Sequence, residues 1–276
     1  MEAFKRHTDA LANLETFAPD VFVGDEEVSQ EICNFVLSLA LIWNDYRDAT
    51  YAHNLLERCE PSDPPGPTRE WGAYGGIDLH LFRYQVTLMR ELLTLVCRHQ
   101  SVARGYYVDG LVRRLPRDAR DAWHTMVQVA LGSVPTDPVG QCLLAVRNKL
   151  SYHYDPRGLE KGYRNHFFGE GREDDSAFIS SGPDMEATRF YFADAAAFGY
   201  LREVPGGGEW DQLSADLRGV MAELSDALMG VVQGFIRYRT GDRSALREEP
   251  QEHGTPSEEQ LVTTPAAGDE RARSTS

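Results

Sequence analysis

Apolar residues recur at steps of three and four along most of the chain, which is the spacing of helices that bury one side. A first long helix is predicted to run toward Cys59 by the apolar stripe Val28, Ile32, Phe35, Val36, Leu39, Ile42, Trp43 and Tyr46. The proline-rich segment 60–67 predicts a loop. A second long helix is expected after Gly75-Gly76, with its stripe between Leu79 and Val96.

The same periodicity predicts further helices. Shorter ones are expected over about 102–115 and from Arg117 onward, and a last long one from about Trp210 to Tyr238. Asp137-Pro138 is typical of a helix start, because the acid can cap the helix and proline suits its first position. The helix that begins there places Val139, Leu143, Val146 and Leu150 on its core side.

The pattern changes over about 166–193, where segments 177–180 and 188–192 are predicted to pair as a short β-hairpin. From Arg243 onward the chain is rich in Glu, Pro, Gly, Ser and Thr, which predicts a disordered tail. The expected fold class is therefore all-α. One helical-bundle domain covers residues 1–242, with a small irregular or hairpin excursion at about 166–193, and a tail covers 243–276.

The net charge of −15 argues against a general nucleic-acid coat protein, which needs a cationic surface. Positive charge is nevertheless concentrated in two windows. Residues 146–168 hold five cations and two acids, interleaved with tyrosine and phenylalanine, and residues 98–121 hold six arginines and three aspartates. A basic segment interleaved with aromatic residues suits single-stranded nucleic acid, although a solvated helix face has the same composition.

Other features of the sequence predict the cellular compartment of the protein. The longest apolar run, Phe35 to Trp43, is too short to span a bilayer, and no apolar segment of a secretory signal follows the charged N-terminus. These features predict a soluble, cytoplasmic protein without a membrane partner. The single cysteines Cys33, Cys59, Cys97 and Cys142 have no metal-binding or redox spacing, so they are expected to be buried, reduced thiols.

The segment from Arg147 to Pro156 has the densest candidate chemistry. Within seven residues it carries Arg147, Asn148, Lys149 and His153 at the end of a predicted helix. An arginine, which is always charged and binds phosphate, therefore stands near a histidine, which titrates around neutral pH. Asp155-Pro156 is expected to end this helix, because a residue before proline is biased away from the helical region.

Arg147-Asn148 followed by His153 resembles the R-x(4–6)-H motif of the HEPN superfamily. The resemblance implies an all-α bundle with the motif on a late helix and a metal-independent ribonuclease activity without a cofactor. It also implies a homodimer in which two motif copies meet. Many members are toxins or act in phage defence, so an antitoxin or another protein partner is expected as well.

The chemistry of these residues suits RNA cleavage. His153 is the candidate acid or base, Arg147 and Asn148 are candidates to hold phosphate oxygens, and RNA is the expected substrate. The candidate RNA-binding residues are Lys149, Tyr152, Tyr154, Arg157, Lys161 and Arg164. Arg147 and His153 lie about 120° apart on an ideal helix, so the site requires either local unwinding near Tyr152 or residues from two subunits.

Two alternatives remain open. A non-catalytic helical binding protein could use the same segment for a nucleotide, RNA or protein partner, with Arg147 in a structural ion pair. A bundle metalloenzyme is a distant alternative, because Asp121 and His124 have the spacing of metal ligands but lack a second copy of the motif. His53, His80 and His99 lie on helical stripes and are expected to be structural or surface histidines.

Overall fold

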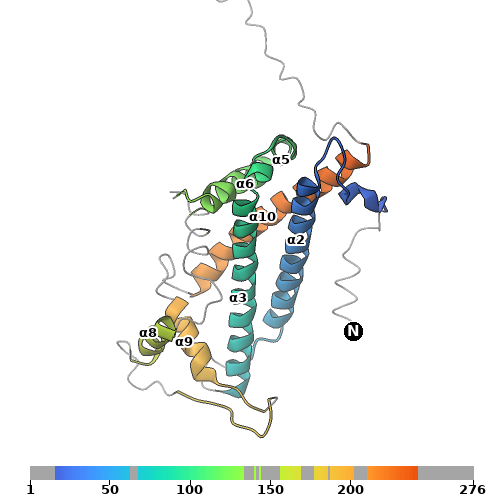
Figure 1. Cartoon of the computed structure of the whole chain (residues 1–276). Helices are drawn as coiled ribbons and strands as arrows, with labels where there is room; N and C mark the ends of the chain where they lie inside the picture. The colour runs from blue at the N-terminus through green and yellow to red at the C-terminus, as the bar shows by residue number, and fades with distance from the viewer. Residues whose placement is uncertain are drawn as a thin grey trace, which may run out of the picture. The chain divides into compact units, whose positions relative to one another are not determined.

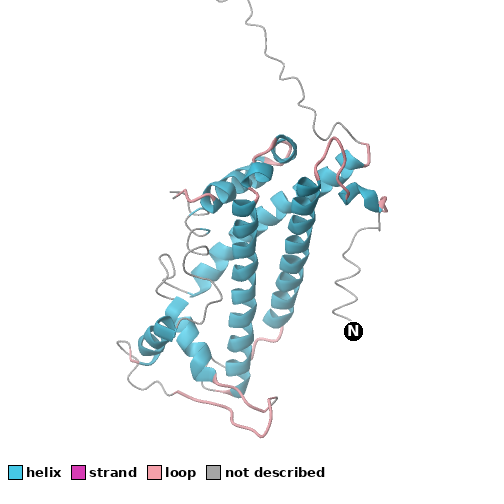
Figure 2. Ribbon diagram, viewed as in Figure 1, coloured by secondary structure: helices cyan, strands magenta, loops and turns pink. Residues whose placement is uncertain are grey.

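The computed structural model describes residues 16–62, 68–133, 140, 143, 156–168, 177–185, 187–201 and 210–241. All of them belong to one unit, Met1–Leu246. The second unit, Arg247–Ser276, lies outside the described residues, as does the whole of the predicted tail, so the tail stays a prediction. Of the described residues 76% are helical and none forms a strand, which confirms the all-α fold class (Figure 2).

The described elements lie in the order η1 (Pro19–Phe22), α2 (Gln30–Glu57), α3 (Arg69–Arg98), α4 (Gln100–Ala103), α5 (Tyr106–Val112), α6 (Arg117–Ala130), α8 (Pro156–Phe167), α9 (Tyr191–Leu201) and α10 (Trp210–Arg239). The first, second and last long helices of the sequence prediction are α2, α3 and α10. The segment predicted to begin at Arg117 is α6.

Helices α2 and α3 form an antiparallel pair that lies side by side (Figure 1). Each begins at a capping side chain that accepts a hydrogen bond from a backbone N–H of the first turn. Ser29 Oγ accepts from Ile32 N at 3.4 Å, and Thr68 Oγ1 accepts from Trp71 N at 3.2 Å. The capping side chains therefore determine where the two helices begin, and the apolar stripes determine which side of each helix is buried.

Helix α10 packs against α2, α5 and α6, and α6 also packs against α3 (Figure 1). Their stripes meet in one core whose largest fully buried side chains include Phe35, Leu39, Leu79, Met89, Trp123, Met126, Leu224, Leu228 and Phe235. By length and composition, the segment Ala215–Arg239 of α10 is long and apolar enough to cross a membrane. Its apolar side, which includes Leu224 and Phe235, forms part of the bundle core.

Gly75-Gly76 does not precede the second long helix, as predicted, but lies inside α3. The prediction was wrong because glycine does not mark a helix boundary here: Gly76 is needed for close packing inside the helix, and Gly75 lies in open space. A Cβ atom on Gly72 would lie 2.2 Å from the Tyr191 ring, and one on Gly76 would lie 1.6 Å from Arg189 Nη2. The first turns of α3 thus leave room for the segment that leads into α9.

The region around 166–193 also differs from the prediction. His166 and Phe167 belong to α8, and Tyr191 to Ala193 belong to α9. Between them the two segments predicted to pair do so at one antiparallel bridge, Ser180 with Arg189, without forming strands in the described residues, so the excursion is largely irregular. Pro156, which was expected to follow the end of a helix, is the first residue of α8, a position that proline favours.

Three smaller expectations have separate outcomes. The helix predicted over 102–115 is split into α4 and α5, with a break at Arg104 and Gly105. Cys33 is buried as predicted, but Cys59 and Cys97 are exposed. Cys59 follows the end of α2, and helical periodicity alone did not show which side of α3 Cys97 faces. Leu143 is helical and fully buried, as the stripe after Asp137-Pro138 requires.

Candidate functional site

The predicted site residues fall into two groups. Arg147, Asn148, Lys149, Tyr152, His153 and Tyr154 lie outside the described residues. Arg157, Lys161 and Arg164 lie on α8, which begins three residues after His153 in the sequence. The geometry of the candidate site is therefore built from α8 and the elements that hold it.

The three predicted cations of α8 form one exposed stripe. Arg157, Lys161 and Arg164 are four and three residues apart, so at about 100° per residue they lie within about 60° of one another. All three are exposed. The acid on α8, Glu160, pairs with Arg164 at 3.1 Å, and both side chains of this pair are about two-thirds exposed. Such a surface pair contributes little to stability, so Arg164 can exchange Glu160 for a phosphate.

An aromatic ring continues this basic stripe. Phe168 follows the last residue of α8, and its backbone N–H donates to Arg164 O at 2.8 Å, so the chain extends the helical turn. The Phe168 ring is 75% exposed, although its neighbour Phe167 is buried. The ring centroids of Phe168 and Tyr163 lie 6.3 Å apart. Three cations and an exposed ring on one line match the way in which proteins bind single-stranded nucleic acid, by charge and stacking.

The opposite side of α8 is fixed by α9 (Figure 1). Gly158 and Gly162 are buried there. A Cβ atom on Gly162 would lie 2.1 Å from Ala196 O, and one on Gly199 would lie 2.1 Å from Gly162 O. The two backbones therefore approach as closely as glycine permits. This contact orients α8 so that Arg157, Lys161 and Arg164 face outward.

A charged cluster that was not predicted lies between α2, α3 and α10. His53 is 6% exposed, and its Nε2 lies 3.0 Å from Arg218 Nη1, although the two residues are 165 positions apart. Arg218 Nη1 also donates to Glu57 Oε1 at 3.3 Å. Asp78 Oδ1 lies 3.4 Å from His53 Nδ1, a charge contact without hydrogen-bond alignment.

The sequence held part of the signal for this cluster. In an antiparallel pair, the end of α2 lies beside the beginning of α3, so His53 and Asp78 could have been placed together. The sequence around Arg218 on α10 did not indicate that this residue contacts them. Of the three histidines predicted to be structural or surface residues, His53 is buried in this cluster, His80 is exposed, and His99 Nδ1 lies 3.2 Å from Glu31 Oε1.

No protein-family model, curated protein or solved structure matches the chain. The all-α fold and the surfaces described above therefore carry the functional argument.

Proposed function

We propose that the protein is a HEPN-like, metal-independent endoribonuclease that acts as a homodimer. The sequence motif of Arg147, Asn148 and His153 supplies the candidate chemistry, and the all-α fold agrees with the superfamily that the motif resembles. The observation that carries the proposal is the basic and aromatic stripe of α8. It follows the motif directly in the chain and offers single-stranded RNA a basic and aromatic surface.

The proposed reaction uses the substrate's own 2′-hydroxyl. Two protons move: one leaves the 2′-hydroxyl as its oxygen attacks phosphorus, and one reaches the departing 5′-oxygen. His153 is assigned to one of these transfers, as base or as acid, and solvent water makes the other. Arg147 binds two nonbridging oxygens as they gain charge, and Asn148 donates to one of them. Lys149 adds electrostatic attraction. The P–O5′ bond breaks, and the products carry a 2′,3′-cyclic phosphate and a 5′-hydroxyl.

The spacing of the motif is the reason for proposing a dimer. Arg147 and His153 lie about 120° apart on one ideal helix, so a single straight helix cannot present both to one phosphate. Two chains related by a two-fold axis can combine the arginine of one with the histidine of the other. Each dimer would then hold two equivalent sites.

The test is cleavage of a mixed RNA pool in EDTA by the wild type, Arg147→Ala and His153→Ala, with analysis of the product ends. We expect the wild type to leave 2′,3′-cyclic phosphates and both variants to lose at least about a hundredfold in rate, the usual scale for removing a general acid or base. An Arg237→Ala variant, altered at an exposed arginine of α10, serves as the control for preparation. Absence of cleavage by a folded wild type, or equal cleavage by all variants, contradicts the proposal.

A further inference from the structure

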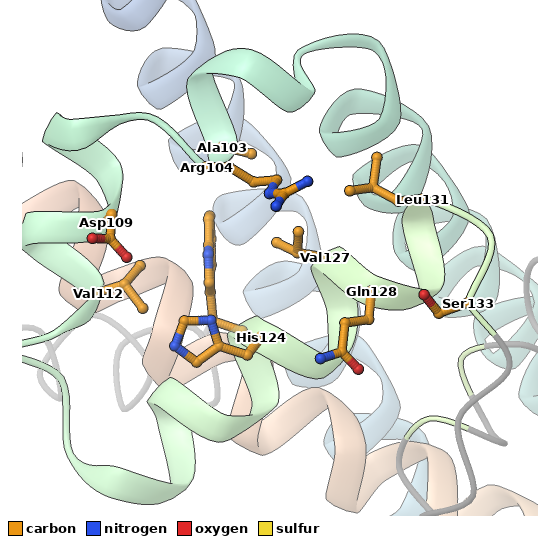
Figure 3. Close-up of a pocket in the computed structure, with 10 residues that line it drawn as sticks. Ala103, Arg104, Asp109, Val112, His124, Val127, Gln128, Leu131 and Ser133 are labelled. Atoms are coloured by element: carbon orange, nitrogen blue, oxygen red, sulfur yellow. The ribbon is translucent and has the colours of Figure 1, made fainter.

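A second site is suggested by a cleft of about 610 Å³ beside α4, α5 and α6 (Figure 3). Its volume lies in the range of small-molecule sites. The floor is apolar and includes Val112 and Val127, and the buried Trp123 lies beneath it. The cleft contains none of the α8 residues assigned to RNA.

Polar side chains from separate elements line the opening. Arg104 directly follows α4, and His124 and Gln128 are one turn apart on the same side of α6 (Figure 3). Ser133 lies just beyond the end of α6. These four side chains make no hydrogen bond or ion pair with the described part of the chain. Each of them can therefore donate a hydrogen bond to a ligand.

The charge balance of the cleft favours an anion. Its carboxylate, Asp109, is paired with Arg113 at 2.8 Å. Nearby on α6, Asp121 is paired with Arg117 at 3.6 Å. The guanidinium of Arg104 therefore stands in the cleft without a compensating carboxylate among the described residues. In a chain with a net charge of −15, this is a local positive site that an anionic ligand would complete.

We propose that the cleft binds a phosphomonoester. A guanidinium binds two phosphate oxygens at once, and His124 on α6 offers a further donor at the opening of the cleft. Gln128 and Ser133 provide neutral donors for hydroxyl or carbonyl groups farther along the ligand, and its less polar body rests on Val112 and Val127. A carboxylate offers two oxygens and fits this set of donors less fully.

Two sources can supply this chemistry, a free small phosphomonoester or the phosphate at the 5′ end of an RNA. Binding should be measured by calorimetry with inorganic phosphate, ribose 5-phosphate and AMP. A second arm compares 5′-phosphorylated and 5′-hydroxyl forms of one short oligoribonucleotide. This arm uses the Lys161→Glu/His153→Ala protein, in which the α8 surface is weakened and the residue assigned to cleavage is removed.

Arg104→Gln is expected to weaken binding at least about tenfold, the scale of one charged hydrogen-bonding partner. Arg104→Lys should retain part of the affinity, and Arg237→Gln, at an exposed arginine of α10, should retain all of it. Preference for AMP or ribose 5-phosphate identifies a free ligand, and preference for the phosphorylated oligoribonucleotide identifies an RNA end. Either result supports the site.

The proposal is overturned if the folded wild type binds none of these probes, or if Arg104→Gln binds them as the wild type does. Because Arg104 and His124 are exposed, their substitution should leave thermal unfolding unchanged, and that measurement accompanies the binding data. The experiment is independent of RNA cleavage. Loss of activity in Arg147→Ala or His153→Ala therefore tests the nuclease proposal without deciding this one.

Discussion

Gly162 of α8 and Gly199 of α9 meet backbone to backbone. A Cβ atom on Gly199 would stand 2.1 Å from Gly162 O, and a Cβ atom on Gly162 would stand 2.1 Å from Ala196 O. These atoms belong to main chain and cannot rotate away, so neither position accepts a larger residue without moving a helix. The outward direction of the α8 cations depends on this contact.

Gly162→Ala and Gly199→Ala should each destabilise the protein by about 1–3 kcal/mol, because the added methyl group separates α8 from α9. Gly219→Ala on α10 is the matched control, since its Cβ would meet nothing within 4 Å. There the higher helix propensity of alanine should stabilise by about 0.5–1 kcal/mol. Urea unfolding of the three variants measures these differences. Equal effects at all three positions would show that the close approach has no energetic importance.

Arg239, at the end of α10, holds the segment around η1. Its guanidinium donates to the backbone carbonyls of Asp20, Val21 and Val23 at 3.3, 3.1 and 2.9 Å and to the Asp25 carboxylate at 2.5 Å. Arg239→Lys should lower the unfolding free energy by about 1–3 kcal/mol, because one ammonium cannot reach all these acceptors. Arg237→Lys, an exposed neighbour, should change it little. Matching losses in the two variants would be incompatible with this role.

The same contact predicts a dependence of stability on pH. Hydrogen bonds from the Val28 backbone N–H and the Arg239 side chain hold the pKa of the Asp25 carboxyl below its ordinary value. Its stabilising contribution is therefore complete above the ordinary aspartate pKa of about 3.9 and is lost as pH falls through the lowered pKa. The difference in urea midpoint between wild type and Asp25→Asn should be constant from about pH 7 to about pH 5 and should shrink below about pH 4. A difference that grows in acid would refute it.

Arg218 determines the neutral tautomer of His53. A guanidinium only donates hydrogen bonds, so His53 Nε2, at 3.0 Å from Arg218 Nη1, must present its lone pair. The hydrogen is then on Nδ1, on the side of Asp78. Nitrogen-15 shifts of the neutral ring should show the Nδ1–H form in the wild type. In Arg218→Ala the Nε2–H form should increase, because Glu57 Oε1 lies 3.4 Å from Nε2 and can accept.

The exposed His124 provides the comparison for this measurement, since its ring should report the same tautomer in wild type and Arg218→Ala. Arg218→Ala should also lower stability by about 0.5–1.5 kcal/mol, the net value of one hydrogen bond. A wild-type ring that is predominantly Nε2–H would remove the basis of the assignment.

The α8 stripe should set RNA affinity through charge. With His153→Ala as background, Lys161→Glu should weaken binding of a single-stranded oligoribonucleotide about tenfold near 0.1 M salt and reduce the salt slope by about one. Arg237→Glu makes the same change of charge on α10 and should have a much smaller effect. Fluorescence anisotropy at several salt concentrations separates the two. Equal losses would indicate that net charge, and not the stripe, governs binding.

The long helices could be predicted because apolar residues such as Leu79 and Leu92 mark a buried side at every turn. Helix α8 was missed although Leu159, Tyr163 and Phe167 recur at four-residue steps, because two glycines, Gly158 and Gly162, lower its helix propensity. Gly162 is required by the close approach of α9, which the sequence does not show. Asp155-Pro156 added to the error. The same dipeptide was taken as a helix start at 137–138 but only as a helix end here, whereas Pro156 also begins α8.

At the candidate site, the composition of the sequence predicted which cations could bind RNA. It did not predict that they lie on one side of a helix, because α8 itself was not predicted. The contact of His53 with Arg218 spans 165 positions, so only the packing of α10 on α2 brings it about. The exposure of Cys97 was likewise a matter of how α3 is rotated in the bundle, and Cys59 is exposed because it follows the end of α2.

The dimer hypothesis can be tested by mixing two inactive proteins. If each site combines Arg147 of one subunit with His153 of the other, a heterodimer of Arg147→Ala and His153→Ala contains one intact pair. Random exchange makes half of the dimers heterodimers, so the mixture should recover roughly a quarter of wild-type cleavage. The double variant Arg147→Ala/His153→Ala, mixed with wild type, is the matched control and forms heterodimers with no intact site. If the two single variants stay inactive after proven subunit exchange, both residues act within one chain, and the helix must unwind between them.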